Sequence, residues 1–109
     1  MPTPEEELRV LDAAIAASRE NQWDDQERGI VAPKPELTGL RMRRGIVRLE
    51  AGLHAGAVED FTFVLMQVPE EVEALTKRAA AHRALGAVDL AKADDARASA
   101  ITGRSRFSS

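Results

Sequence analysis

The side chains able to do acid–base or metal chemistry in this chain are few and poorly spaced for it. His54 and His82 are the only histidines, they lie 28 positions apart, and cysteine is absent. A metal site needs three or four convergent ligands, and no HExxH-type spacing supplies them. The adjacent pairs Asp24–Asp25 and Asp94–Asp95 cannot act as facing carboxylates, because neighbours on a helix point about 100° apart. The sequence therefore predicts no enzyme and no metal or cofactor site.

The densest basic segment is Arg41-x-Arg43-Arg44, followed by Arg48. One turn of helix spreads these side chains around most of the circumference, so we expect a solvated face and not a continuous basic stripe. The overall charge agrees: 15 Lys and Arg against 18 Asp and Glu give a net charge of −3. Proteins that bind nucleic acids or anionic membranes normally carry a basic excess. The sequence therefore predicts a partner that is neither nucleic acid nor membrane.

No apolar run approaches the length of a membrane span. The first residues are acidic, with Glu5, Glu6 and Glu7 in succession, the opposite of a secretory n-region. Together with the lack of cysteine, these features lead us to expect a cytoplasmic protein.

Three Pro-Glu dipeptides, beginning at Pro4, Pro35 and Pro69, stand 31 and 34 residues apart. Proline suits the first position of a helix and glutamate its first turn. Seventeen positions after each proline stands a residue typical of helix ends, namely Asn21, Gly52 and Gly86. A period in this range is typical of helical hairpins that bury their cores by stacking.

We therefore predict an all-α array of about five to six helices in a single domain, residues 1–109. Its expected units are 4–34, 35–68 and 69–102, with a frayed tail at 103–109. The expected helices are 4–20, 35–51, 53–68, 69–85 and 88–101. Whether 22–34 forms a further short helix stays open, because Gly29 weakens that pattern.

Two segments share an order of small residues and turn residues. They read Arg44-Gly45-x6-Gly52-x4-Ala57-x3-Phe61-x2-Val64-x4-Pro69 and Arg78-Ala79-x6-Gly86-x4-Ala91-x6-Ala98. The identities at a shift of 34 are Arg44/Arg78, Gly52/Gly86, Ala57/Ala91 and Asp60/Asp94. In this phase the chain resembles tetratricopeptide repeats, most clearly over residues 38–71 and 72–102. The resemblance implies a short right-handed array of antiparallel hairpins, in which unit 4–34 is either a degenerate repeat or a helical cap.

Small residues in this pattern have a physical role. Gly45 and Ala79 are expected where the two helices of a hairpin approach closely. Ala57 and Ala91 would let the second helix lie against the first.

In this family the first helices of successive hairpins line a concave groove. The resemblance places these residues there: Leu11, Ile15, Met42, Arg43, Ile46, Leu49, Lys77 and Arg83. Such a surface is apolar at one end and basic at the other, which would suit an amphipathic helix or an extended peptide with acidic residues. The alternative is that the apolar members pack on one another as core, so that the groove is filled by the protein itself.

The function expected from these features is a protein–protein interaction module or adaptor. It would bind a peptide, a helix or a second copy of itself without a covalent step, since a short array leaves apolar ends exposed. The alternative is a small regulatory chaperone that shields a client. Trp23 is either a packing residue of the first unit or an anchor at a partner interface.

Overall fold

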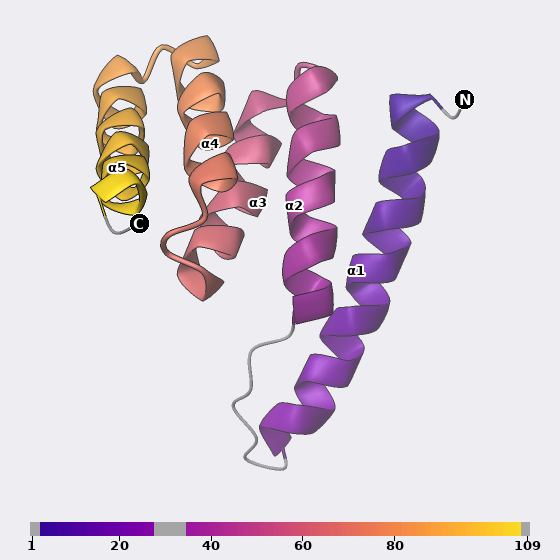
Figure 1. Ribbon diagram of the computed structural model, residues 1–109. Coiled ribbons are helices and arrows are strands. Elements are labelled where there is room, and N and C mark those ends of the chain that lie inside the picture. The colour runs from indigo at the N-terminus through magenta and orange to yellow at the C-terminus, as the bar shows by residue number, and fades with distance from the viewer. Residues whose placement is uncertain (1–2, 28–34, 108–109) are drawn as a thin grey trace.

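The computed structural model describes the backbone of residues 3–27 and 35–107, and the side chains of residues 3–17 and 37–103. This part contains five helices: α1 (Pro4–Glu27), α2 (Pro35–Glu50), α3 (His54–Gln67), α4 (Val72–Ala84) and α5 (Val88–Phe107). Each helix packs on the next and runs in the opposite direction, as Figure 1 shows. No strand occurs in the described residues. The predicted all-α array of antiparallel helical hairpins is confirmed.

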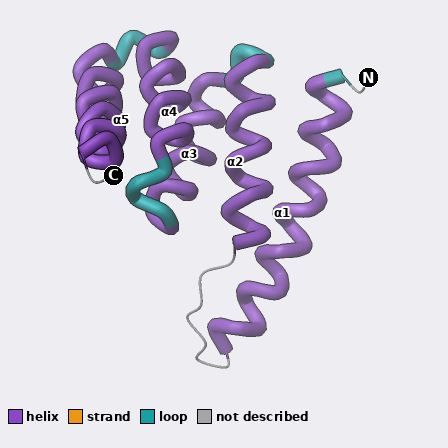
Figure 2. The backbone as a smooth tube through the Cα atoms, in the orientation of Figure 1, coloured by secondary structure: helices purple, strands orange, loops and turns teal. Residues whose placement is uncertain are grey.

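Gly52 and Gly86 close the two well-described hairpins in the same way. They have φ of +83° and +82°, in the left-handed region. The amide of Gly52 donates to the Leu49 carbonyl at 3.2 Å, and the amide of Leu53 to the Arg48 carbonyl at 2.8 Å. The second turn repeats both bonds, the pattern of a Schellman cap. The resulting loops are short (Figure 2), so α2 and α3, and likewise α4 and α5, fold back on one another directly.

We expect Gly52→Ala or Gly86→Ala to destabilise the protein by about 1–2 kcal/mol, because a Cβ is strained in the left-handed conformation. Urea unfolding followed by circular dichroism measures the loss. Gly39→Ala is the matched control: Gly39 lies within α2 and a Cβ there would meet nothing within 4 Å. That control should gain about 0.5–1 kcal/mol from helix propensity. Equal effects at Gly39 and Gly52 would contradict the assigned role of the turns.

The prediction that the first helix ends at Asn21 is wrong, because α1 continues to Glu27. Asparagine lowers helix propensity by less than about 0.7 kcal/mol, which does not stop a helix by itself. The interval 22–34 is thus helical as far as Glu27, and residues 28–34 lie outside the described part. The first unit is one long helix up to that point, with no turn at Asn21.

Two other helix ends differ from prediction. α4 begins at Val72, not at Pro69, because residues 68–71 form the reversal between α3 and α4. Val68 leaves the helical region, with φ −131° and ψ 84°, as expected for a residue before proline. Glu71 then caps α4 by accepting from the amide of Glu73. α5 continues to Phe107, six residues beyond the predicted end at Ile101.

The core lies where α3 packs on α2 and α4, and α5 adds Ala98 to it from the other side of α4. Phe61, at the centre of this core, is 0% exposed. The buried residues of this cluster are Ala57, Phe61, Val64, Leu65, Ala74, Leu75, Ala81 and Ala98. Many are alanines, which let helix backbones approach closely.

Gly45 shows how close that approach is. A Cβ at Gly45 would lie 2.7 Å from the Phe61 ring. Ala57, Ala79 and Ala91 are all fully buried. The predicted role of Gly45 as a contact point between helices is confirmed, and the burial of the three alanines agrees with the same role.

None of the described helices is both long and apolar enough to cross a lipid bilayer.

Candidate functional site

Asp60 is a fully buried carboxylate that holds three arginines from the neighbouring helix. Arg44 Nη2 lies 2.7 Å from Asp60 Oδ1, Arg41 Nη1 lies 3.1 Å from the same oxygen, and Arg48 Nη1 lies 3.3 Å from Oδ2. Arg48 also donates to the carbonyl of Gly56 at 3.2 Å. This cluster ties α2 to α3 through charge-assisted hydrogen bonds.

The prediction that these arginines form a solvated face is wrong. Positions 41, 44 and 48 are spaced by three and four residues, so they share one face of α2, and only Arg43 departs from it. The hydrogen bonds of Arg44 to Asp60 raise its pKa above the ordinary value, against the opposing effect of burial. Arg41 also places its guanidinium over the Phe63 ring, 4.8 Å from the centroid.

The second hairpin contains the same kind of pair at a shift of 34 residues. Arg78 Nη2 lies 2.6 Å from Oδ1 of the buried Asp94, and its Nε donates to Oδ2 at 2.8 Å. His82, at the position equivalent to Arg48, has Nε2 3.8 Å from Asp94 Oδ2. Arg44 therefore pairs with Asp60 in the first of these hairpins, as its counterpart Arg78 pairs with Asp94 in the second. The repetition of both charged residues at a shift of 34 was the signal in the sequence for these ion pairs.

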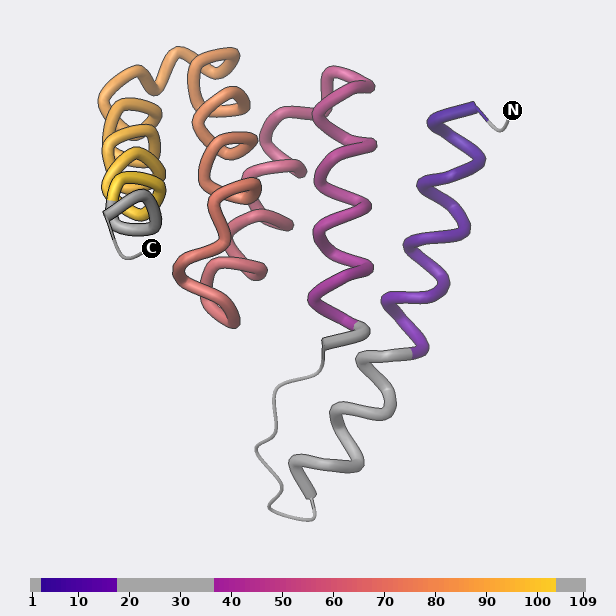
Figure 3. The backbone as a smooth tube through the Cα atoms, in the orientation of Figure 1, coloured from indigo at the N-terminus to yellow at the C-terminus, as the bar shows by residue number. Residues whose placement is uncertain are grey.

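The contacts of Arg44 and of its counterpart Arg78 show where α1 lies. Arg44 also contacts Asp12 of α1 at 2.8 Å, and the equivalent Arg78 also contacts Thr62 of α3 at 3.3 Å. Relative to α2, α1 therefore lies where α3 lies relative to α4. It runs in the same direction as α3 and α5 (Figure 1, Figure 3), so it corresponds to the second helix of a hairpin and not to the first.

This placement changes the setting of the predicted groove residues on α1. Leu11 and Ile15 are 8% and 2% exposed. Met42, Ile46 and Leu49 are half-buried and pack against the core cluster. These five side chains therefore agree with the second expectation, in which the apolar stripe packs within the protein as core.

The basic members of the predicted groove separate. Arg43 remains half-exposed and forms an ion pair with Glu7 of α1. Arg83 forms an ion pair with Asp95 of α5. Lys77 is half-buried and has no ion pair with any side chain in the described part. The structure therefore does not gather Arg43 and Arg83 on one surface with the apolar stripe.

Other candidate residues have simple placements. Trp23 lies in α1, and its side chain is outside the described part. His54 begins α3, whereas His82 lies in α4. Among the described residues, no group of three or more His, Cys, Asp or Glu side chains is placed to hold a metal ion.

A groove of about 480 Å³ lies at the turn end of the array. We call it the turn groove, and its lining residues are Arg48, Gly52, Leu53, His54, Ala55, Gly56, Glu59 and Leu85. Leu53 and Leu85 come from successive hairpin turns, and each is 51% exposed. Arg48, fixed by Asp60 and the Gly56 carbonyl, forms a rigid polar wall beside them.

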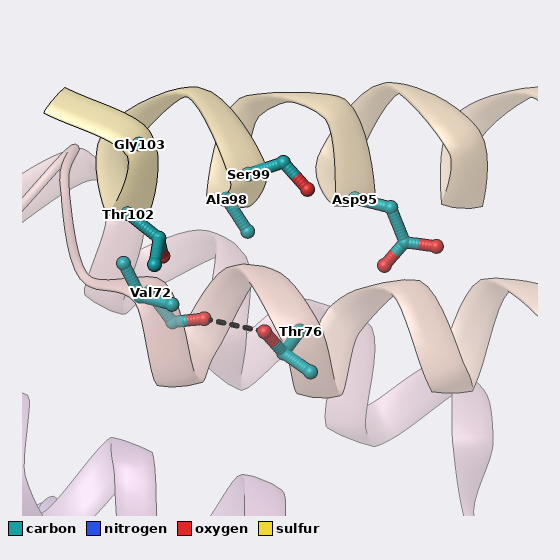
Figure 4. Close-up of a pocket in the computed structure, with 7 residues that line it drawn as sticks. All are labelled: Val72, Thr76, Asp95, Ala98, Ser99, Thr102 and Gly103. Carbon is teal, nitrogen blue, oxygen red and sulfur yellow. Dashed lines mark hydrogen bonds between the residues drawn. The ribbon is translucent and has the colours of Figure 1, made fainter. Parts of the chain in front are cut away.

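A second groove, of about 450 Å³, lies between α4 and α5 near the C-terminal end of the described chain (Figure 4). We call it the terminal groove, and its lining residues are Val72, Thr76, Asp95, Ala98, Ser99, Thr102 and Gly103. Four of its seven lining residues carry a hydroxyl or carboxylate group, whereas the turn groove includes the large apolar side chains of Leu53 and Leu85.

No family model, no curated protein and no solved structure matches this chain.

Proposed function

We propose that this protein is a protein-binding module, and that the turn groove is its contact surface. The supporting observation is that Leu53 and Leu85, each half-exposed, border one groove from two successive hairpins. Folding leaves these large apolar side chains in water, and covering such a surface is favourable at about 25 cal/mol per Å².

The composition of the turn groove suits a protein partner. Its apolar side chains are flanked by Arg48 on α2 and by the exposed Glu59 on α3. An apolar centre with a charged rim is the usual anatomy of a protein interface. An amphipathic helix or peptide would place apolar side chains on Leu53 and Leu85. Binding of this kind involves no covalent step. The proposal also places the protein in the cytoplasm, which the lack of cysteine supports.

The test is a comparison of captured proteins between variants. Immobilised wild-type protein and a Leu53→Ala/Leu85→Ala variant are incubated with extract of the source cells, and the bound proteins are quantified by mass spectrometry. Removing an anchor side chain typically costs more than about 1 kcal/mol, so we expect a specific partner to be reduced by about tenfold for the double variant.

Met66→Ala is the matched control. Met66 is 73% exposed on α3, outside the turn groove, so its removal lowers exposed apolar area without touching that surface. A partner retained by Met66→Ala and lost by the double variant supports the proposal. Identical captured proteins for all three would exclude the turn groove.

The same experiment tests the concave surface implied by the family resemblance. Arg43→Glu/Lys77→Glu reverses the charge of two of its three basic side chains. Loss of the partner only in this variant would move the site to that surface.

Sedimentation equilibrium of wild type and Leu53→Lys determines whether the partner is a second copy, because a dimer that uses the turn groove would dissociate in the variant.

A further inference from the structure

Three of the residues that line the terminal groove are the counterparts of core residues 34 positions earlier. Asp95, Ala98 and Ser99 of α5 correspond to Phe61, Val64 and Leu65 of α3. Those three apolar residues are buried in the core cluster, where α3 is covered by α4. The terminal groove is thus the place where a further helix would pack if the array continued.

The terminal groove carries polar side chains at several positions where the surface of α2 and α3 that packs on α4 carries apolar ones. Thr76 stands where α2 has Met42, and Thr102 stands where Val68 follows the last residue of α3. The pair Leu49 and Phe61 is replaced by the ion pair Arg83 and Asp95. Val72 and Ala98 keep an apolar floor. Figure 4 shows Asp95, Ser99 and Thr102 of α5 directed toward α4, whereas the hydroxyl of Thr76 donates to the Val72 carbonyl of its own helix.

α1 provides an independent comparison. Because Asp12 takes the place of Thr62, Leu11 and Ile15 of α1 correspond to Phe61 and Leu65 of α3. Both α1 residues are buried against α2. The two helices that are followed by another helix therefore present large apolar residues at these positions, whereas α5 presents Asp95 and Ser99.

We propose that the α4–α5 hairpin is the last unit of the array, because packing of a further helix in the terminal groove is unfavourable. A helix seated there would remove the ion pair of Arg83 and Asp95 and the hydroxyls of Ser99 and Thr102 from water, and burying charged and polar groups is unfavourable unless the helix offers them partners. The hairpin thereby prevents head-to-tail stacking of copies through this end, a contact that would not close on itself. The inference does not depend on the proposed function.

The test uses the chain's own α4 as the probe. A synthetic peptide of residues 69–85, blocked at both ends, carries the helix that packs on α3 in the native fold. The variant Thr76→Met/Asp95→Phe/Ser99→Leu/Thr102→Val gives the terminal groove the residues of its inner counterpart. By isothermal titration calorimetry, we expect the variant to bind this peptide at least about tenfold more tightly than wild type. Sedimentation velocity should also show larger species for the variant alone.

Asp89→Phe/Ala93→Leu/Ala100→Val is the matched control. These exposed positions lie outside the terminal groove, and their counterparts Ala55, Glu59 and Met66 are exposed as well. Tight binding of the peptide to wild type would overturn the proposal, as would equal gains in the groove variant and the control.

A smaller variant protects the test from misfolding. Ser99→Leu/Thr102→Val changes two exposed residues and leaves the ion pair of Arg83 and Asp95 intact. It should gain part of the affinity while keeping the wild-type circular dichroism spectrum. No gain in a folded double variant would count against the proposal.

Discussion

Asp60→Ala is expected to lower the free energy of unfolding by about 3–5 kcal/mol, because the change leaves a cluster of buried charges without its shared partner. Arg41, Arg44 and Arg48 all donate to this one carboxylate. Their side chains are only 11–21% exposed, so water can replace little of what Asp60 supplies. Urea unfolding monitored by circular dichroism gives the loss directly.

Asp12→Ala is the control for this prediction. Asp12 is the second carboxylate of Arg44, but its side chain is half-exposed. Its removal should cost no more than about 1 kcal/mol, as is usual for exposed ion pairs. Equal shifts for Asp12→Ala and Asp60→Ala would show that burial of the cluster does not govern its energy.

The Asp60 variant also bears on the turn groove. Asp60 and the Gly56 carbonyl together hold Arg48, which forms one wall of that groove. Asp60→Asn keeps an oxygen that can accept a hydrogen bond while removing the charge, so its stability should lie between those of wild type and Asp60→Ala. Partner capture that weakens in parallel with stability would link the cluster to the proposed function.

Phe61→Ala is expected to cost about 3–5 kcal/mol, because it empties the centre of the core. Phe61 is fully buried, and its ring lies against Gly45 of α2. Phe63→Ala is the control on the same helix. Phe63 is half-buried, so less apolar area and no enclosed cavity are involved, and the loss should be clearly smaller.

Gly45 makes a second check possible. A Cβ at Gly45 would point at the Phe61 ring, so Gly45→Val in the Phe61→Ala background would place methyl groups in the vacated space. The double variant should be more stable than Phe61→Ala alone, although Gly45→Val in the wild-type background should be destabilising through overpacking. Additive effects of the two changes would show that the residues do not share one packing site.

Several features follow from local sequence, and the structure confirms them. The turns at Gly52 and Gly86 require a positive φ, which glycine adopts without strain. The close approach at Gly45 and the buried alanines follow from the spacing of small residues along helices. The residue type and its spacing along a helix show such positions in the sequence, although the partner across the contact, such as Phe61 for Gly45, lies on another helix.

The charged and apolar faces were harder to assign. The spacing of Arg41, Arg44 and Arg48 shows that they share a face, but Asp60, which they contact, comes from the next helix. Leu11 and Ile15 form a helical stripe whether it faces core or groove. Only the position of α1 against α2 shows that the stripe is covered.

The amino-acid sequence by itself determined the helices, their glycine turns and the 34-residue relation between the two hairpins, because backbone conformation responds to near neighbours. The tertiary structure decided that α1 is one continuous helix with the role of a second helix, and that Arg41, Arg44 and Arg48 are partly buried around Asp60. It also decided that Leu53 and Leu85 border one groove from two hairpins, while Asp95, Ser99 and Thr102 line the terminal groove. These outcomes depend on which faces meet, and contact between helices joins residues that are distant in the sequence.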